Sequence, residues 1–444
     1  MRVLFLSNGF PPHRWAGTEH HTAALAKELA GRGDEVRVVC AGDWDTGRAP
    51  YNGFTDAVDE GIPVRRLHLN WTKPADPFRS LYDNDAVAKV LDGYLDEWRP
   101  DVVHVMSCET LSASVLAVAK ARALRTVLSL TDFWFLCPRI TLLRTDGENC
   151  DGHATPGDCL VCLSRSSRAY RWPRLLLPDR AVGRLLHLVG RVPALSRRRG
   201  LRGMVGDMAA RQRFLSDAIR WPDVRVTASP FVRRMHESNG VDAPIRIAPY
   251  GHDLSWLRAP VYRAPSPVVR LGYVGQLVPS KGVHVLLEAV RRLPAPLRSR
   301  VALRVYGDPD KVPSYGAELR ALSAGLPDVA FCGTYRHDDS AAVYASFDVM
   351  VVPSLWYDFP LVIHEAFATG APVIATRLGG MAEAVVHDGN GLLVDKGDVE
   401  GLARCLARLV EEPDLLPRLR AGISPVKSIA DEVDEMRTCY EARA

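Results

Sequence analysis

The stretch Trp356–Thr376, WYDFPLVIHEAFATGAPVIAT, predicts a turn, a short helix and a strand. The helix is apolar around almost its whole circumference, and such a helix belongs inside a protein. It nevertheless carries Glu365 near its middle, and Asp358 stands just before its start. A buried carboxylate without a partner is costly. Glu365 therefore either accepts hydrogen bonds from a ligand or pairs with an internal Arg or Lys.

The start of this helix favours the first interpretation. Pro360 suits the first helical position, where its missing N–H costs nothing. The backbone N–H groups of Phe359 and Leu361 would then be free to meet anions or sugar hydroxyls. A ribose would satisfy Glu365, because one carboxylate can accept hydrogen bonds from both hydroxyls of the ring.

Outward from this stretch, short apolar runs alternate with helical patterns, as in parallel α/β sheets. The predicted strands are Val3–Ser7, Glu35–Cys40, Val102–Val105, Thr126–Ser129, Arg225–Ala228 and Ile245–Ala248, and then Val269–Val274, Ala302–Tyr306, Val329–Phe331, Val349–Val352, Pro372–Ala375 and Gly391–Val394. An Arg- and Pro-rich linker at 258–267 divides the two sets. We expect two Rossmann-like parallel-sheet domains, 1–257 and 268–425, that face one another across a cleft. Segment 426–444 should pack back toward the first domain as a helix.

Composition excludes several classes of protein. The 444 residues are 47% hydrophobic and 24% charged, with a net charge of +4, as in an ordinary globular chain. This mild positive charge and the lack of a recognition motif argue against nucleic acid as a partner. No apolar run approaches the ~18 residues of a membrane span, and the first one is too short for a signal peptide. We therefore expect a cytoplasmic protein.

Segment 137–214 breaks the alternation and is predicted to be an insertion in the first domain. It begins with four cysteines, at Cys137, Cys150, Cys159 and Cys162. Four thiolates in a loop-rich segment are typical of a structural zinc site. The alternatives are four reduced thiols, or two disulfides if the protein is exported.

The remainder of the insertion, from Arg165 to Arg213, is rich in arginine. Three interpretations stand: a solvated helical hairpin, a lid for an anionic or lipid-linked acceptor, or a peripheral contact with a membrane surface. The apolar runs Leu175–Leu177 and Leu185–Val189 would supply the apolar faces that a membrane contact needs.

Two further loops resemble phosphate-binding segments. In GYVGQLVPSKGVHVLLEA, Gly272–Ala289, a strand ends at Gly275 and Lys281 opens a helix, where its ammonium group can reach a phosphate. In the first domain, Gly17 begins the first helix and allows close backbone approach to a pyrophosphate. The alternatives are that Lys281 is an ordinary surface lysine and that Gly17 is a glycine without a binding role. The GxGxxG pattern of dinucleotide-binding proteins is absent.

Taken together, these stretches resemble the GT4 family of retaining glycosyltransferases, which has the GT-B fold. The resemblance covers nearly the whole chain and is strongest over Val269–Asp395. The motifs that carry it are GQLVPSKG, VVPSLWYDFPLVIHEAFATGAPVIAT, GGMAEAV and DGNGLLV, together with FPPHRWAGTEHH, PDVVHV and LTDFWFLCPR in the first domain.

The resemblance implies a nucleoside-diphosphate sugar bound to the second domain. Glu365 matches the glutamate that binds ribose, Lys281 a lysine that binds the diphosphate, and Phe359, Pro360 and Leu361 the segment whose amides meet sugar and phosphate. Gly333 and Tyr335 fall where the family lines the base pocket, and Gly17 falls where the first domain meets the diphosphate.

Several positions depart from the family pattern. Gln276 stands where an arginine usually follows the glycine of the phosphate loop, so one positive charge on the diphosphate is either missing or supplied elsewhere, by Arg377 or Arg139. Asp358 lies one residue closer to Glu365 than the family's first acid does. In the first domain Met106 and Thr131 replace two histidines of the pattern.

The implied reaction is transfer of a sugar to an acceptor hydroxyl with retention, without a catalytic metal or other cofactor and without a protein nucleophile. Asp358, Asp132 and His104 are the candidate catalytic residues, although His104 could equally be a packed residue at a strand end. The acceptor could be a saccharide, a lipid-linked glycan or a small molecule. The alternatives are a GT-B epimerase or phosphorylase, or a binding protein that has lost turnover.

Overall fold

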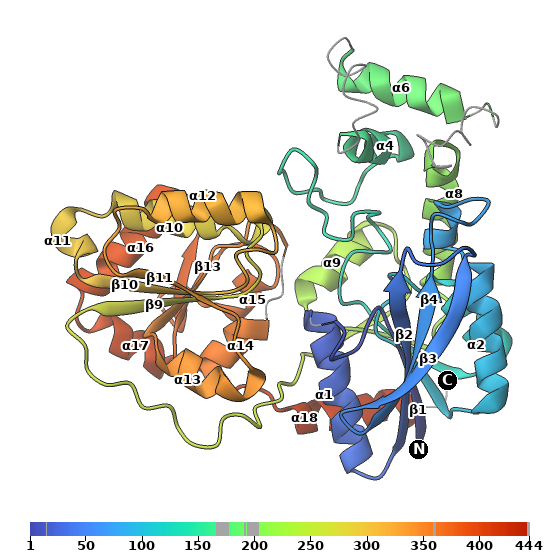
Figure 1. Ribbon diagram of the computed structural model, residues 1–444, viewed down its shortest axis with the longest axis horizontal. Coiled ribbons are helices and arrows are strands. Elements are labelled where there is room, and N and C mark those ends of the chain that lie inside the picture. Colours follow the sequence, from blue (N-terminus) through green and yellow to red (C-terminus); the bar gives the residue numbers. More distant parts are fainter. Residues whose placement is uncertain (15, 166–176, 191, 193–203, 358–360, 442–444) are drawn as a thin grey trace. The chain divides into compact units, whose positions relative to one another are not determined.

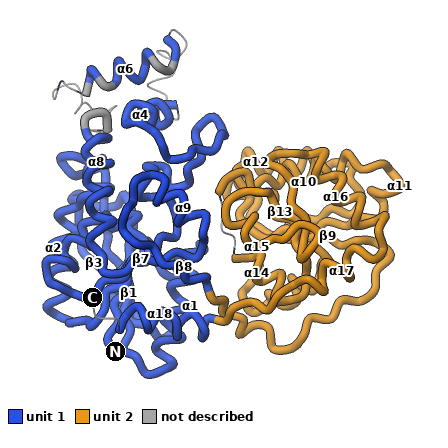
Figure 2. The backbone as a smooth tube through the Cα atoms, turned by 180° about the vertical axis from the view of Figure 1, so that it is seen from behind, with its two compact units in different colours: residues 1–250, 429–444 blue, residues 251–428 orange. Residues whose placement is uncertain are grey.

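The computed structural model describes residues 1–14, 16–165, 177–190, 192, 204–357 and 361–441. The chain forms two compact units (Figure 2). Unit 1 comprises Met1–Tyr250 together with Ile429–Ala444, and unit 2 comprises Gly251–Ser428. The chain therefore leaves unit 1, builds the whole of unit 2, and returns.

Unit 1 is built on an eight-stranded sheet in the order β3-β4-β2-β1-β5-β6-β7-β8. All neighbouring strands are parallel except β3 and β4, which form an antiparallel hairpin at one edge. The strands are β1 Arg2–Ser7, β2 Glu35–Trp44, β3 Tyr51–Asp59, β4 Ile62–Leu69, β5 Val102–Val105, β6 Arg125–Ser129, β7 Val224–Thr227 and β8 Ile245–Ile247.

Helices cover both faces of this sheet, as Figure 1 shows for α1 and α18 on one side and α2 on the other. The α-helices are α1 Gly17–Gly31, α2 Asp85–Glu97, α3 Ser114–Ala121, α4 Pro156–Ser164, α6 Asp179–Gly190, α8 Met204–Ala218, α9 Pro230–Ser238 and α18 Ile429–Glu441. One hydrophobic cluster joins β1, β2 and β5 to α1 and α18. Helix α18 thus completes the core of unit 1, although it follows unit 2 in the sequence.

Unit 2 has a wholly parallel six-stranded sheet in the order β11-β10-β9-β12-β13-β14. Its strands are β9 Val269–Val274, β10 Val301–Tyr306, β11 Val329–Gly333, β12 Val349–Val352, β13 Val373–Thr376 and β14 Gly391–Val394. Its helices are η3 Pro279–Lys281, α10 Val283–Arg292, α11 Ala295–Arg298, α12 Pro313–Ser323, η4 His337–Asp339, α13 Ser340–Ala345, α14 Leu361–Ala368, α15 Met381–Ala384, α16 Val399–Glu411 and α17 Leu415–Ala421.

Alternate residues of these strands point to opposite faces of the sheet and pack into two separate hydrophobic cores. On β12, Val349 and Val351 pack with α10 and α16, whereas Met350 and Val352 pack with α13 and α14. Strands β12, β13 and β14 are buried along their whole length, so their sequences are almost continuous apolar runs. The predicted fold class, two Rossmann-like parallel-sheet domains, is confirmed.

The connection from β6 to β7 contains α4, α6 and α8. Residues 166–176, 191 and 193–203 of the arginine-rich stretch between Arg165 and Arg213 lie outside the described residues. In the described part, α6 buries Val182 and Leu186 while Leu185 and Leu188 are exposed. None of the helices that the structure describes is long and apolar enough to cross a lipid bilayer.

Candidate active site

Glu365 lies on α14, where its carboxylate is held by a tyrosine. Its Oε2 accepts a hydrogen bond from the hydroxyl group of Tyr344 at 2.5 Å. Burial raises the pKa of Glu365, and the Tyr344 hydrogen bond and the nearby His337 oppose this rise. Among the described residues no Arg or Lys side chain forms an ion pair with it. The partner of this carboxylate is a neutral phenol, so the internal-cation interpretation is not what the structure shows.

Tyr344 belongs to a small aromatic group beside Glu365. Tyr335, two residues after β11, interacts through its hydroxyl group with Tyr344 and Ser340, and burial raises its pKa. The Tyr306 and Tyr335 rings meet edge to face, with centroids 5.8 Å apart. The structure thus brings together Glu365 and Tyr335, which the sequence predicted, with Tyr344, which sequence reasoning missed.

One predicted catalytic residue and two predicted donor-binding residues fall on a segment that the structure does not describe. Asp358, Phe359 and Pro360 lie outside the described residues, so the structure does not show their backbone amides. Leu361 is the first residue of α14. Gly333 ends β11 with φ +71° and its carbonyl accepts a hydrogen bond from Gly307 N.

The loop after β9 carries Gln276 and Lys281. Gln276 is exposed, and its backbone carbonyl accepts a hydrogen bond from the Tyr273 hydroxyl at 2.8 Å. Lys281 ends the short η3 helix, and its Nζ lies 5.4 Å from the centre of the Trp356 ring. Gly282 follows with φ +71°, and a Cβ there would stand 2.0 Å from the Pro353 carbonyl oxygen. Glycine is therefore required where this loop crosses the end of β12.

The amides at the start of α10 already have a partner. The Tyr315 hydroxyl accepts a hydrogen bond from His284 N at 3.2 Å and lies 2.8 Å from His284 Nδ1. The Val283 amide also interacts with this hydroxyl. A phosphate at this loop would consequently rely on the Lys281 side chain more than on the first amides of α10.

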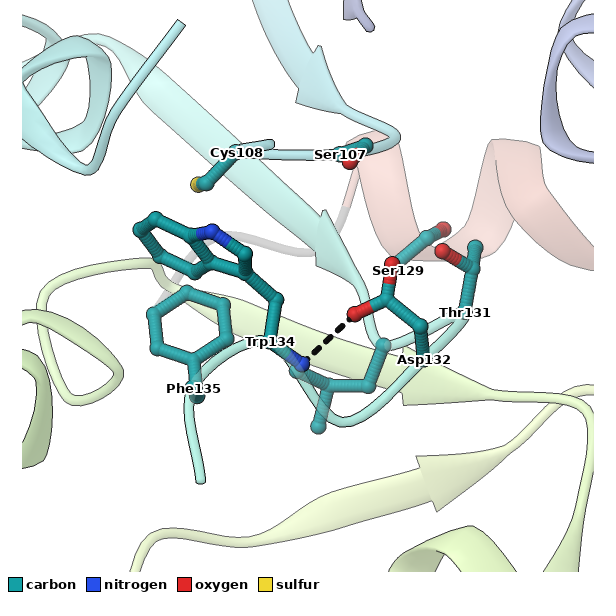
Figure 3. A pocket seen from close by; sticks show the side chains of 8 residues that line it. Ser107, Cys108, Ser129, Thr131, Asp132, Trp134 and Phe135 are labelled. Atoms are coloured by element: carbon teal, nitrogen blue, oxygen red, sulfur yellow. Dashed lines mark hydrogen bonds between the residues drawn. The ribbon is translucent and has the colours of Figure 1, made fainter. Parts of the chain in front are cut away.

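Unit 1 carries a cluster of acids beyond the carboxyl ends of β1, β5 and β6. Asp132 lies in the pocket of Figure 3, with Ser107, Cys108, Ser129 and Trp134 around it. Its Oδ1 accepts a hydrogen bond from Trp134 N at 2.7 Å. Burial raises the pKa of Asp132 to about 6.

Glu109, in the loop after β5, is an acid that sequence reasoning missed. Burial, together with the negative charges of Asp132 and Glu19, raises its pKa to about 7, while Arg14 and Asn8 oppose the shift. Glu19 is in the first turn of α1, two residues after Gly17, and its Oε2 is buried without a hydrogen-bond partner among the described residues. These acids come from loops far apart in sequence, so only the fold reveals the cluster.

His104 is completely buried on β5 and both of its ring nitrogens are engaged. Nδ1 lies 2.8 Å from the Tyr440 hydroxyl and Nε2 lies 2.8 Å from Ser129 Oγ. Burial lowers the pKa of His104 to about 3. A neutral histidine that joins β5, β6 and α18 fits a packing role better than proton transfer.

The four cysteines predicted to bind zinc all lie in the described part of the β6–β7 connection, as free thiols. Cys159 and Cys162 are three residues apart on α4, and Cys137 and Cys150 lie in the loops before it. Within the described residues, no three His, Cys, Asp or Glu side chains are already arranged as a set of metal ligands.

Family comparisons cover most of the chain. Residues 16–251 match the family described as "Glycosyl transferase 4-like domain", and residues 268–412 match "Glycosyl transferases group 1". The chain is also similar to the D-inositol 3-phosphate glycosyltransferase of Saccharomonospora viridis, with 38% identity over 36% of this chain and 38% of that protein. A lipopolysaccharide core biosynthesis glycosyltransferase, LpsE of Rhizobium meliloti, is 37% identical over 35% of this chain and 43% of its own length. The chain thus spans less than half of the length of the curated relatives that it matches.

Solved structures agree on the fold. HepE of Anabaena, solved with UDP and glucose, has a TM-score of 0.65 at 17% identity and covers 100% of both chains. Sucrose-phosphate synthase of Thermosynechococcus elongatus has a TM-score of 0.63 at 18% identity over 99% of this chain and 98% of its own. The matches do not favour an epimerase, a phosphorylase or a binding protein. This protein belongs to the GT4 family of glycosyltransferases, the group 1 enzymes with the GT-B fold.

Proposed function

We propose that the protein transfers a sugar from a nucleoside-diphosphate sugar to an acceptor hydroxyl with retention of anomeric configuration. The observation that carries this proposal is the Glu365 carboxylate, buried on α14 and fixed by Tyr344 on one oxygen only. Among the described residues Oε1 has no hydrogen-bond partner. A ribose hydroxyl pair would satisfy the carboxylate, because an ionised carboxylate only accepts hydrogen bonds.

The diphosphate would be held by charge and by backbone amides. Lys281 supplies an ammonium group beside the end of β12, and the amides at the start of α14 supply donors where helix polarity favours an anion. Gln276 adds no charge. The site therefore stabilises the leaving diphosphate with fewer positive groups than the family pattern implies, and positioning carries more of the catalysis.

In this proposal the acceptor binds to unit 1, near Asp132 and Glu109. Carboxylates whose pKa values lie near 6 and 7 can accept a hydrogen bond from an acceptor hydroxyl, or its proton, close to neutral pH. No protein nucleophile is needed if an oxygen of the departing phosphate assists the acceptor hydroxyl on the same face of the sugar.

UDP sugars are the first donors to test, because HepE was solved with UDP and glucose and with UDP-glucose. A thermal-shift panel of UDP, GDP, ADP and dTDP sugars should show stabilisation by one nucleotide, since a ligand of the folded state raises its melting temperature. Glu365→Gln should remove most of that shift, while Glu318→Gln, on the separate helix α12, should keep it.

Product analysis completes the test. NMR of the glycoside made from an α-linked donor should show an α linkage. An inverted product overturns the retaining assignment. A donor shift that survives Glu365→Gln undiminished overturns the placement of the ribose.

A further inference from the structure

Four cysteines meet in the connection between β6 and β7, in the part of that connection that follows Asp132 in the sequence. We call Cys137, Cys150, Cys159 and Cys162 the four-cysteine cluster. The Cys159 thiol lies close enough to the other three to interact electrostatically with each of them. Cys159 and Cys162 share one face of α4 because they are separated by three residues on a helix.

The two loop cysteines sit in turns that aim backbone N–H groups at sulfur. Arg139 N donates to Cys137 Sγ at 3.4 Å, and Gly152 N donates to Cys150 Sγ at 3.4 Å. In each case the donor lies two residues after the cysteine. Hydrogen bonds to sulfur favour the thiolate, which is the form that binds a metal.

Backbone contacts tie these two turns together. Cys150 N donates to the Leu142 carbonyl at 2.6 Å, and Leu142 N points to the sulfur of Cys137. The hairpin between them reaches α4, since Thr145 Oγ1 donates to the Cys162 carbonyl at 2.9 Å. The loops and the helix are therefore already joined around the thiols.

A buried cation lies against the same thiols. Arg211, on α8, is only 3% exposed, and it interacts electrostatically with Cys137 and Cys159. Its Nη2 donates to the Trp134 carbonyl at 2.5 Å, but its buried Nη1 has no hydrogen-bond partner. No carboxylate of the described residues forms an ion pair with it. The Trp134 ring, whose centre lies 5.4 Å from the guanidinium carbon, offsets part of the cost of this buried charge, but a negative group that neutral thiols do not supply would stabilise it further.

We propose that the four-cysteine cluster binds a single Zn²⁺ ion through its four sulfur atoms. Binding would release four thiol protons to solvent and leave a centre with a net charge of −2, which would face the guanidinium of Arg211. Tetrahedral sulfur coordination is the usual geometry of structural zinc. The ion would hold the hairpin at 142–150 against α4 and α8.

The cluster must contract for this to happen. The sulfur atoms would move to about 2.3 Å from the ion, whereas no closed ligand set exists in the described residues.

Metal analysis of the full chain tests the proposal. Protein purified without chelators, under reducing conditions, should contain one zinc per chain by mass spectrometry. Cys150→Ser combined with Cys162→Ser should lose it, and Cys332→Ser, which alters an exposed cysteine of unit 2, should retain it. A wild-type protein that stays metal-free after incubation with zinc sulfate overturns the proposal, as does iron in place of zinc or a double variant that keeps its zinc.

A second measurement does not depend on the variants folding. Wild-type protein loaded with Co²⁺ should show the thiolate charge-transfer and visible ligand-field bands of a tetrahedral sulfur site. Absence of these bands, or thiol counting that finds two disulfides in the cluster under the same conditions, refutes zinc binding.

Arg211 offers a test of the charge argument. Arg211→Met should release zinc to a competing chelator faster, with an affinity loss of about tenfold to a hundredfold as for other groups that support metal ligands. Arg211→Lys keeps the charge and should lose less. Equal zinc retention in wild type and Arg211→Met would show that the guanidinium does not face a charged centre.

Discussion

Tyr344 donates a hydrogen bond to Glu365 across 2.5 Å, and so joins α13 to α14 on the same side of the unit 2 sheet. The phenol is fully buried, and burial raises its pKa well above the usual value, as does the neighbouring Glu365 carboxylate. The tyrosine therefore stays protonated and can only donate here. It fixes one oxygen of Glu365 and, in our proposal, leaves the other for the donor.

Tyr344→Phe should weaken donor binding and destabilise the protein by about 1–3 kcal/mol, because the buried carboxylate loses its partner. The Tyr344 hydrogen bond lowers the pKa of Glu365, so its removal should raise that pKa further. If Glu365 binds ribose as proposed, it must be ionised to do so. Donor affinity should then fall as pH falls, and this fall should begin at a higher pH in the variant than in the wild type. Titration calorimetry over a range of pH values measures both effects.

Tyr262→Phe is the matched control, because Tyr262 is 80% exposed in the same unit. It should change neither the stability nor the pH profile. If Tyr344→Phe keeps the wild-type profile, the tyrosine does not tune the ribose carboxylate.

Gln276→Arg should strengthen donor binding by restoring the charge that the family pattern has in this loop. Gln276 is exposed, so the gain should be modest, about 1 kcal/mol or fivefold in Kd, and should shrink in high salt. Gln276→Glu reverses the sign and should weaken binding. Kd values for the nucleoside diphosphate at two salt concentrations test this, and equal affinities for the Arg and Glu variants would place the diphosphate elsewhere.

Glu109 should make the protein less stable as pH rises. Its pKa rises from 4.5 in the unfolded chain to about 7 in the fold, so between these values the folded state binds more protons. Stability is then greatest below about pH 4.5 for this group and declines until about pH 7. Glu109→Gln should remove that decline. The change in the free energy of unfolding from pH 5 to pH 8 should therefore be more favourable in the variant than in the wild type, by on the order of 1–3 kcal/mol.

Urea unfolding at the two pH values measures the effect. Glu148→Gln, an exposed acid of the same unit, provides the control. The same slope in wild type and Glu109→Gln would mean that Glu109 is not held in its protonated form. Loss of turnover in Glu109→Gln with unchanged donor affinity would further place this acid on the acceptor side.

Tyr440→Phe should destabilise unit 1 by about 1–3 kcal/mol, because His104 Nδ1 loses its buried partner. If His104 only packs, turnover per folded molecule should be unchanged. Thr438→Val, at an exposed position of α18, should be nearly neutral. A large loss of kcat in Tyr440→Phe at unchanged stability would return His104 to the catalytic candidates.

The strands were predictable wherever both faces are buried. The apolar runs of β12 and β14 predict their bounds to the residue, because nothing polar interrupts them, and the bounds of β5 and β9 were predicted as well although His104 and Arg270 lie within them. The hairpin β3–β4 escaped prediction, since β3 is an edge strand whose residues are largely exposed and reads as a loop. Helix α8 was also missed, because its apolar residues do not form one clear stripe.

The candidate site was predictable only in part, for a related reason. Glu365 stands out because an acid in an apolar helix is a local conflict that needs an explanation. Tyr344 does not stand out in the sequence, because a tyrosine in a helix is typical of an ordinary core residue. Glu109 and Arg211 owe their surroundings to residues distant in sequence, and no local pattern marks them.

The return of the chain to unit 1 has a consequence for biosynthesis. Unit 2 is one uninterrupted segment and can finish folding while α18 has not yet been translated. Unit 1 cannot, because Val433, Met436 and Tyr440, which belong to its core, follow unit 2 in the sequence. During synthesis one face of its sheet therefore stays partly exposed until α18 has been translated. A ribosome that stalls within unit 2 would yield a first unit with exposed apolar surface, which is prone to aggregate.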